Sequence, residues 1–459
     1  MRRRDIDMLN GSLASSILRY SIPIMLTNIL QMLFHSADLV VVGQYRGSMY
    51  VGAVSATGAI TNLIINLMIG FSLGIGVTVA RGLGSKRDED VYRAVHTALP
   101  TAILGGAIVS LIGVIFAEDF LVMMDTTESI LPHAVLYMQI NFGGMVFTMI
   151  YNFCASILRA AGDTKSPLQF LTISGVVNVI LNLIFVLGFG MDVDGVGYAT
   201  VISKAVSAVL VVLALVKRTD VCHLELRKIR FYKQPLIKLL YVGLPAGIQS
   251  SLFAISNVFV QSAINSFHSD ALIAGNGAGS SIDGFLSVGL ESFQHAALNF
   301  TGQNAGAHRF DRIKKTFRIC IGYMFLFGLS AGLLIRLFAE PLLSLYINDS
   351  PEAIAYGVIR FTYIAIPYFI CGMMTVSTGS LRGLGASFIP MAISVLGICG
   401  LRVLWIETVF QIPKYHTPEC LYMSFIVSWI STFIVQTIVY MIVLKRKEQA
   451  YKLCSNRSI

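Results

Sequence analysis

The stretch FHSADLVVV, residues 34–42, places a carboxylate inside a long apolar segment. An ionised side chain at the centre of a bilayer costs about 2.5–3.5 kcal/mol on insertion scales, so such groups face a cavity or a polar partner. Loss of water also favours the neutral form of a carboxylate, which suits a group that gains and loses a proton. Asp38 is therefore a candidate for binding a proton or a cation. The alternative is an acid near the end of a span that only hydrogen-bonds a neighbour.

His35 lies three residues before Asp38, so on a helix the two side chains share a face. Histidine titrates near physiological pH and can share a proton with a carboxylate. A lone histidine in a span more often has a packing role, and both interpretations stay open.

Three acids of the C-terminal half also lie in apolar segments: Asp283, Glu291 and Glu407. Asp283 and Glu291 are candidates for binding a cationic substrate or a coupling ion. For Glu291 the alternative is an ion pair with Arg360 or Arg402, which are expected at membrane depth as well.

The composition is that of a membrane protein. Of the 459 residues, 55% are hydrophobic and 13% are charged, whereas ordinary soluble domains carry about a quarter charged residues. The net charge of +9 comes from basic residues beside apolar segments, so it indicates topology and not nucleic-acid binding. The seven cysteines have no metal or redox spacing. We expect no metal site, no cofactor and no enzymatic activity.

The apolar segments predict an all-α polytopic membrane protein with twelve transmembrane helices. The predicted spans are roughly residues 16–42, 51–80, 94–117, 133–158, 168–189, 197–216, 237–266, 271–300, 316–338, 353–380, 388–412 and 420–444.

The segments between the spans alternate in charge. One set is basic, such as residues 81–93 and 309–318, and the other is acidic, such as residues 118–128 and 340–352. Because basic loops remain in the cytoplasm, both termini are predicted there, in a plasma-membrane protein.

The chain also repeats itself. Pro23 corresponds to Pro245 at an offset of 222 residues, and LRAAGDTKSP at 158–167 corresponds to LRGLGASFIP at 381–390 at an offset of 223. We therefore expect two six-helix bundles: residues 1–216, a basic cytoplasmic linker at 217–236, and residues 237–459 with a short basic tail. Parallel repeats of this kind enclose a site near the membrane midplane and suit alternating access.

Two of these segments, LRAAGDTKSPL and ADLVVVGQYRG, together with GQNAGA at 302–307, resemble multidrug and toxic compound extrusion (MATE) transporters of the bacterial, DinF-like type. The resemblance extends over nearly the whole chain. It implies a pair of bundles that exports drugs by antiport with H⁺ or Na⁺.

The resemblance also implies a polar coupling cluster in the N-terminal bundle and a proline that bends the first span. The matching cluster residues are Asp38, Asn152, Asn178, Asn182 and Thr200. Asn182 stands where that branch has a second acid. Pro23 matches the bending proline; since Pro245 is its repeat partner, the alternative is a shared kink without a switching role.

Asn178 and Asn182 are four residues apart and share a helix face. With Thr200 they can solvate an ion or hydrogen-bond a protonated acid; the alternative is contact between helices, where Asn and Thr are common. One carboxylate favours H⁺ over Na⁺, although carbonyl and amide oxygens can still hold Na⁺.

We expect a secondary antiporter, monomeric among membrane lipids, that exports cationic, amphipathic small molecules. The alternative is a lipid-linked oligosaccharide flippase of the same superfamily. An embedded enzyme is disfavoured, because the chain has no HExxH and no GxSxG motif.

Overall fold

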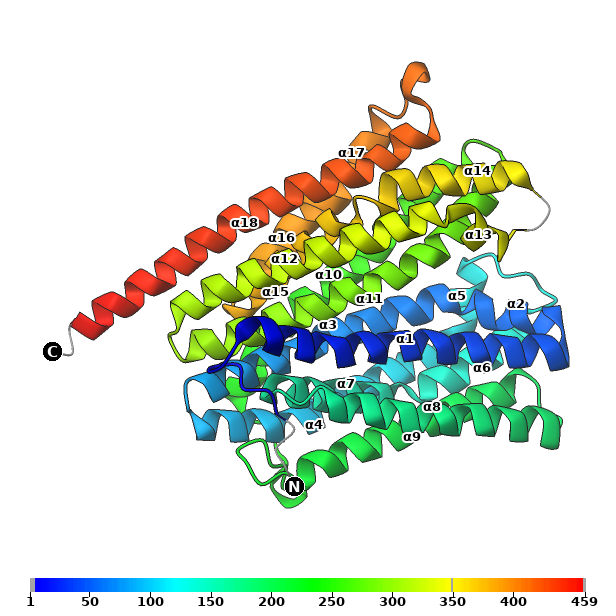
Figure 1. Ribbon diagram of the computed structural model, residues 1–459. Coiled ribbons are helices and arrows are strands. Elements are labelled where there is room, and N and C mark those ends of the chain that lie inside the picture. The colour runs from blue at the N-terminus through cyan, green and yellow to red at the C-terminus, as the bar shows by residue number, and fades with distance from the viewer. Residues whose placement is uncertain (1–4, 348–349, 457–459) are drawn as a thin grey trace. The chain divides into compact units, whose positions relative to one another are not determined.

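A computed structural model describes residues 5–347 and 350–456, without the side chains of His35, Ser48 and residues 455–456. The described chain is almost entirely helical (Figure 1). In the N-terminal half the helices are α1 (Leu13–Arg46), α2 (Ser48–Ala56), α3 (Gly58–Gly84), α4 (Asp88–Ile115), α5 (Ala117–Met123), α6 (Leu131–Gly143), α7 (Met145–Ala161), α8 (Lys165–Leu183), η1 (Ile184–Gly188), α9 (Val193–Val216) and η2 (Leu226–Lys228). In the C-terminal half they are α10 (Lys233–Asn265), α11 (Asp270–Gly306), α12 (Phe310–Leu337), α13 (Ala339–Ser344), α14 (Pro351–Arg360), η3 (Phe361–Ala365), α15 (Tyr368–Gly383), α16 (Phe388–Ser394), η4 (Val395–Gly400), α17 (Leu401–Glu407), η5 (Pro413–Tyr415) and α18 (Pro418–Asn456).

Each predicted span corresponds to a helix or to consecutive helical segments. In the described chain ten of them are long and apolar enough to cross a membrane, and α6 with α7, bent by 41°, makes an eleventh. The remaining one is α11, which is 37 residues long but too polar for that criterion. Its buried face carries Asn276, Asp283 and Asn299, and it packs against α12, α14 and α15. A helix surrounded by other helices can carry polar groups that lipid would not tolerate.

The chain forms two compact units. Unit 1 comprises Met1–Ile6 and Leu26–Gly247, and unit 2 comprises Asp7–Met25 and Ile248–Ile459. The chain therefore passes from one unit to the other inside α1 and again inside α10, close to Pro23 and Pro245 respectively. Both prolines lie within continuous helix. The predicted division at residues 217–236 follows the repeat and remains a prediction.

Local side chains determine where several helices begin and end. Ser269 accepts a hydrogen bond from Leu272 N at the start of α11, and Ser350 does the same for Ala353 N at the start of α14, each at 3.2 Å. These are N-caps, in which a hydroxyl takes up one of the unpaired amides of the first turn. At the end of α7, Gly162 has φ +99°, a left-handed conformation that favours glycine and ends a helix.

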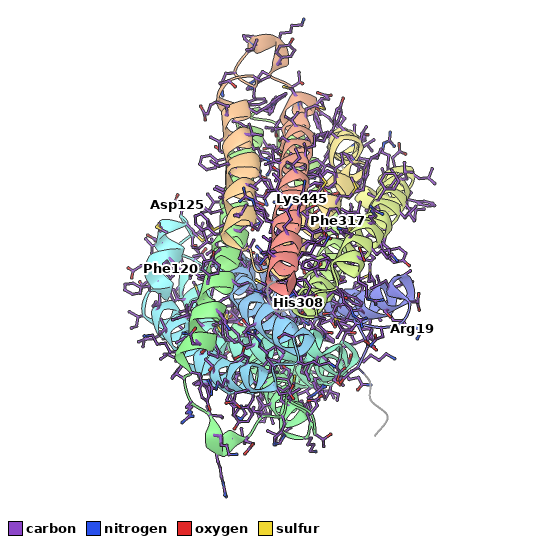
Figure 2. All side chains as sticks on the ribbon, turned by 90° about the vertical axis from the view of Figure 1, so that its left-hand side faces the viewer. Arg19, Phe120, Asp125, His308, Phe317 and Lys445 are labelled. Carbon is purple, nitrogen blue, oxygen red and sulfur yellow. The ribbon has the colours of Figure 1, made fainter. Side chains whose placement is uncertain are left out.

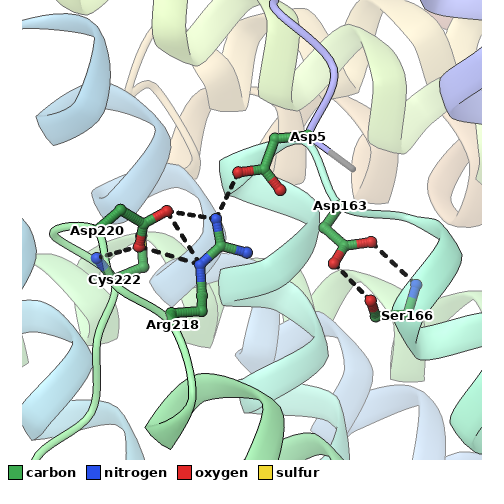
Figure 3. Close-up of polar contacts among 6 residues, drawn as sticks. All are labelled: Asp5, Asp163, Ser166, Arg218, Asp220 and Cys222. Carbon is green, nitrogen blue, oxygen red and sulfur yellow. Dashed lines mark hydrogen bonds and ion pairs between the residues drawn. The ribbon is translucent and has the colours of Figure 1, made fainter. Parts of the chain in front are cut away.

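The turn that follows Gly162 is fixed from two sides, and Figure 3 shows one of them, the contacts of Asp163 with Ser166. Asp163 accepts hydrogen bonds from Ser166 N (2.9 Å) and Ser166 Oγ (2.6 Å) in the first turn of α8. Gly162 O accepts from Ile6 N at 3.1 Å, and a Cβ on Gly162 would lie 2.5 Å from Ile6 O. The repeated motif is thus a structural turn that holds the start of the chain in unit 1.

The linker is ordered within unit 1. Arg218 binds Asp5 at 2.6 Å and Asp220 at 2.5 Å, and Asp220 also accepts from Cys222 N at 3.0 Å (Figure 3). Burial raises the pKa of the Cys222 thiol to about 12. The basic linker is therefore a packed segment and not a free tether.

The C-terminal part of α18 packs beside the beginning of α12 in unit 2. Phe317 stacks on Tyr440 and His308 stacks on Tyr451, each with ring centroids 4.2 Å apart. Figure 2 shows His308 and Phe317 next to the helix that carries Lys445. These contacts fix the C-terminal part of α18, a helix that is longer than a bilayer crossing requires.

Candidate functional site

A carboxylate is buried in unit 1 with polar partners from two other helices. Asp38, on α1, is 5% exposed. Its Oδ1 accepts a hydrogen bond from Asn182 Nδ2 on α8 at 2.6 Å, and its Oδ2 accepts one from Thr200 Oγ1 on α9 at 3.2 Å. The acid predicted from the sequence is therefore inside the bundle and is not a misassigned loop residue.

The partners of Asp38 are bonded to one another. Asn182 Nδ2 also reaches Asn178 Oδ1 at 3.3 Å, and Asn178 Nδ2 reaches Thr200 Oγ1 at 3.4 Å. The cluster thus has one carboxylate and amide and hydroxyl donors that bind acceptors within the cluster. One acceptor, Asn182 Oδ1, is buried and has no hydrogen-bond partner among the described residues.

A glycine allows α1 and α8 to approach closely next to this cluster. Gly175 lies three residues before Asn178 on α8, and a Cβ built on it would lie 1.8 Å from the ring of Phe34. Phe34 is one turn before Asp38 on α1. A larger residue at 175 would displace the ring, so the glycine lets α1 and α8 bring Asp38 within reach of Asn182.

Of the other residues predicted for this cluster, Asn152 is separate from it. It is buried on α7, but it makes no hydrogen bond to the four cluster residues in the described part of the chain. The side chain of His35 lies outside the described residues, so its predicted contact with Asp38 stays a prediction. Pro23 lies fifteen residues earlier on α1, and its role as a kink or gate, like that of Pro245, also remains a prediction.

Two polar side chains near the cluster were not predicted as part of it. Lys204, one turn after Thr200 on α9, donates to Asn141 Oδ1 on α6 at 3.3 Å. Lys204 and Tyr137, also on α6, both lie within electrostatic reach of Asp38. The only signal in the sequence was that a lysine occurs inside a span, which does not reveal its partner.

In unit 2 the buried acid is part of an ion pair. Asp283 Oδ2 accepts from Arg360 Nε at 3.0 Å and from Arg360 Nη2 at 2.9 Å. Arg360 Nη1 donates to Asn276 Oδ1 at 2.6 Å, and Tyr422 donates to the same oxygen at 3.2 Å. Asp283, predicted as a possible substrate or coupling residue, is thus engaged by Arg360, the residue predicted as an alternative partner for Glu291.

The other two acids are at the surface. Glu291 is exposed on α11, so it remains a candidate for binding a cation. Glu407 is exposed at the end of α17 and forms no ion pair among the described residues. Within the described ranges no group of three His, Cys, Asp or Glu side chains could hold a metal ion.

A second polar cluster in unit 2 was missed by sequence reasoning. Arg402, on α17, is 3% exposed. Its Nη1 contacts Ser256 Oγ at 3.3 Å and Asn257 Oδ1 at 3.5 Å, both on α10, and its guanidinium lies 3.9 Å from the ring centroid of Phe425 on α18. The π-helical segment η4 ends two residues before Arg402, and such segments often accompany functional sites.

Comparisons with known proteins agree with this architecture. The MatE family model matches the chain twice, over residues 23–184 and 245–405. The two matches begin 222 residues apart, which is the offset of the internal repeat. Together they cover well over half of the chain.

Relatives and solved structures match over most of their length. The probable multidrug resistance protein YoeA of Bacillus subtilis (strain 168) is 29% identical over 84% of this chain and 84% of its own. A protein named FAD transporter, from Shewanella oneidensis, is 24% identical over 86% of this chain and 87% of its own. A solved structure of a multidrug resistance MATE family transporter of the MOP superfamily, in an outward-facing conformation, superposes with a TM-score of 0.87 and 19% identity, covering 97% of this chain and 98% of that one.

The fold is that of MATE transporters, which have twelve helices in two bundles, and the chain is an integral, multi-pass membrane transporter and not an enzyme. With the family model matched in both halves, the chain belongs to the MatE family of multidrug and toxic compound extrusion transporters.

Proposed function

We propose that this protein is a secondary antiporter that exports small organic molecules in exchange for H⁺ or Na⁺, with Asp38 as the coupling carboxylate. The observation that carries the proposal is the buried Asp38, which accepts hydrogen bonds from Asn182 and Thr200. The relatives named for multidrug resistance support drugs as the substrate class and favour export over the flippase alternative.

The cluster can accommodate both charge states of Asp38. When the carboxylate is ionised, the amide of Asn182 and the hydroxyl of Thr200 donate to its two oxygens. When it is protonated, its O–H needs an acceptor, and rotation of the Asn182 amide presents Oδ1, which has no partner in this state. Asp38 thus has a hydrogen-bond partner in both charge states, while the rotation of the amide gives up the bond from Asn182 Nδ2 to Asn178 Oδ1.

Sodium is the second candidate ion. One carboxylate oxygen and the neutral oxygens of Asn178, Asn182 and Thr200 provide the hard oxygen ligands that alkali and alkaline-earth cations prefer. Binding of H⁺ or Na⁺ would compensate the same buried charge.

The setting of the proposal is a plasma membrane with both termini in the cytoplasm, as the alternation of basic and acidic connections predicts. Organic cations are one proposed substrate class, for which the exposed Glu291 is the candidate contact. We propose a monomer, because each unit contains its own polar cluster.

Purified protein in liposomes tests the proposal directly. Ethidium transport is measured with a proton gradient and, separately, with a sodium gradient. The wild-type protein should transport under at least one gradient. Asp38→Asn should fall to the level of protein-free liposomes under both, because the side chain keeps its shape but can no longer change charge.

The matched control is Glu407→Gln, which also neutralises an acid of a span but one that is exposed and outside the cluster. It should transport as the wild type does. Full activity of Asp38→Asn under both gradients contradicts the coupling role, and absence of any transport by the wild type contradicts export of this substrate class.

Asn182→Asp should increase the response to Na⁺ relative to H⁺, since it adds a second negative charge beside Asp38.

A further inference from the structure

Three arginines are buried in the described part of unit 2, and they differ in their partners. Arg360 is paired with Asp283. Arg382 donates to Gln249 Oε1 at 2.7 Å, and it has a repeat partner, Arg159, at the offset of 223, so the shared fold explains it. Arg402 forms no ion pair with a carboxylate among the described residues, and its Nε has no hydrogen-bond partner there.

An arginine buried without a counterion lowers the stability of the folded protein. A buried charge without a counterion loses hydration that neutral partners do not replace. Ser256 and Asn257 contribute two long contacts, at 3.3 and 3.5 Å, to a single nitrogen of Arg402. Phe425 covers one face of the guanidinium at 3.9 Å, which helps to hold the charge. The two contacts leave Nη2 as a donor for another ligand, whereas Nε is buried and has no hydrogen-bond partner among the described residues.

The position of this cluster repeats that of the Asp38 cluster. The offset of 222 relates Val260 on α10 to Asp38 on α1, and the offset of 223 relates Arg402 to Val179, the neighbour of Asn178 on α8. α10, α17 and α18 therefore stand in unit 2 as α1, α8 and α9 stand in unit 1. The corresponding sets of helices thus hold a buried carboxylate on the first helix of unit 1 and a buried guanidinium on the fifth span of unit 2, at residues that are not equivalent.

We propose that Arg402, with Ser256 and Asn257, binds a carboxylate or phosphate group of the transported molecule. Arg presents planar, paired donors that match the oxygens of either group. Asn257 is exposed, so the cluster can be reached at the surface of α10. Trp429 is buried and packs edge-on against Phe425 with ring centroids 5.6 Å apart, so it holds in place the ring that covers the guanidinium.

The proposal rests on the proposed transport function but concerns a different residue and a different step. It predicts substrates that carry an anionic group, either organic anions or zwitterions. The absence of a repeat partner for the charge argues against a purely structural role, because unit 1 has the same arrangement of helices with valine at that position.

Binding to the purified full-length protein in detergent tests it without any ion gradient. Fluorescein, a planar organic anion, and ethidium, a planar organic cation, are the probes, read by fluorescence polarisation. Arg402→Gln should bind fluorescein about ten- to a hundredfold more weakly than the wild type, as expected for loss of a charged hydrogen-bonded contact. Its affinity for ethidium should not fall. Arg402→Lys, which keeps the charge but not the planar fork, should be intermediate.

Arg336→Gln is the matched control, because Arg336 is a partly exposed arginine of the same unit whose Nε binds Thr362 at 2.9 Å. It should bind both probes as the wild type does. Unchanged fluorescein affinity in Arg402→Gln overturns the proposal. Native mass spectrometry tests whether the bound group belongs to a lipid. If the wild type retains phosphatidylglycerol, Arg402→Gln loses it and both bind fluorescein equally, Arg402 holds a lipid phosphate and the proposal is overturned.

Thermal unfolding separates this role from a structural one. Arg402→Gln removes an unpaired charge and should be at least as stable as the wild type in the absence of ligand. A loss of stability as large as that of Arg360→Gln overturns the proposal. Failure of gradient-driven ethidium transport would instead count against coupling at Asp38, and the binding result would stand.

Discussion

The pair of Asp283 and Arg360 provides a quantitative test of the interior of unit 2. Both residues are buried, and two donors of the guanidinium, Nε and Nη2, bind the same carboxylate oxygen at 3.0 and 2.9 Å. Replacing either partner leaves the other as an uncompensated buried charge, which costs about 3–5 kcal/mol. We therefore expect Asp283→Asn and Arg360→Gln each to lower the free energy of unfolding by about that amount.

The double variant should behave differently from the sum of the two. Once both charges are absent, no uncompensated charge remains, so the double variant should lose about as much as one single variant. The cycle then gives a coupling energy with a magnitude of about 3–5 kcal/mol, at or above the upper end for contacting residues. Asn276 remains in place in all variants and keeps its bond from Tyr422 at 3.2 Å.

Reversible unfolding in mixed detergent micelles, followed by tryptophan fluorescence, measures these differences. Both tryptophans of the chain, Trp405 and Trp429, lie in unit 2, so the signal reports on the unit that is perturbed. If the two single losses add in the double variant, the residues do not act as a pair and the reasoning fails. Losses below about 1 kcal/mol would show that water reaches the pair and screens it.

Three further predictions concern other parts of the molecule. Thr200→Val removes a donor to Asp38 Oδ2 and should reduce gradient-driven transport about tenfold. Thr200→Ser keeps the hydroxyl and should retain most of the transport, so equal rates for the two variants contradict the role of the hydroxyl. Gly332→Ala would place a methyl group 2.1 Å from the backbone oxygen of Ala365 and should lower the free energy of unfolding by about 1–3 kcal/mol; an unchanged value would mean that α12 and η3 are farther apart. Burial raises the pKa of Cys222 to about 12, so at pH 7 this residue has almost no thiolate. It should resist maleimide in the folded protein while the exposed Cys454 reacts, as read by mass spectrometry after digestion. Rapid labelling of both cysteines refutes the packed linker.

Much of the architecture could be predicted from the sequence because membrane insertion leaves strong signals. Apolar length indicates the spans, and the repeat appears at one nearly constant offset. α11 is predicted as the span at residues 271–300, but its signal is the weakest because its polar residues face other helices and not lipid. Pattern alone does not reveal how much of a helix is surrounded by protein.

The candidate site could be predicted only in part. Asn178 and Asn182 share a helix face by spacing alone, but the contact of Asn182 with Asp38 depends on how closely α1 and α8 approach at Gly175. Asn152 matched the family pattern and yet lies outside that hydrogen-bond set. Arg402 was seen only as a partner for an acid, because a sequence does not show which of several buried arginines its acids will reach.

The length of α18 has a practical consequence for imaging. At 39 residues it is about 58 Å long, against about 30 Å for the hydrocarbon layer of a bilayer. Its far end is braced by the 2.8 Å contact of Glu448 with Lys314 and by Tyr451 stacked on His308. A soluble domain fused to it through uninterrupted helix would keep a fixed orientation. Single-particle electron microscopy of a chain that is nearly all membrane-embedded needs such a rigid alignment marker outside the micelle.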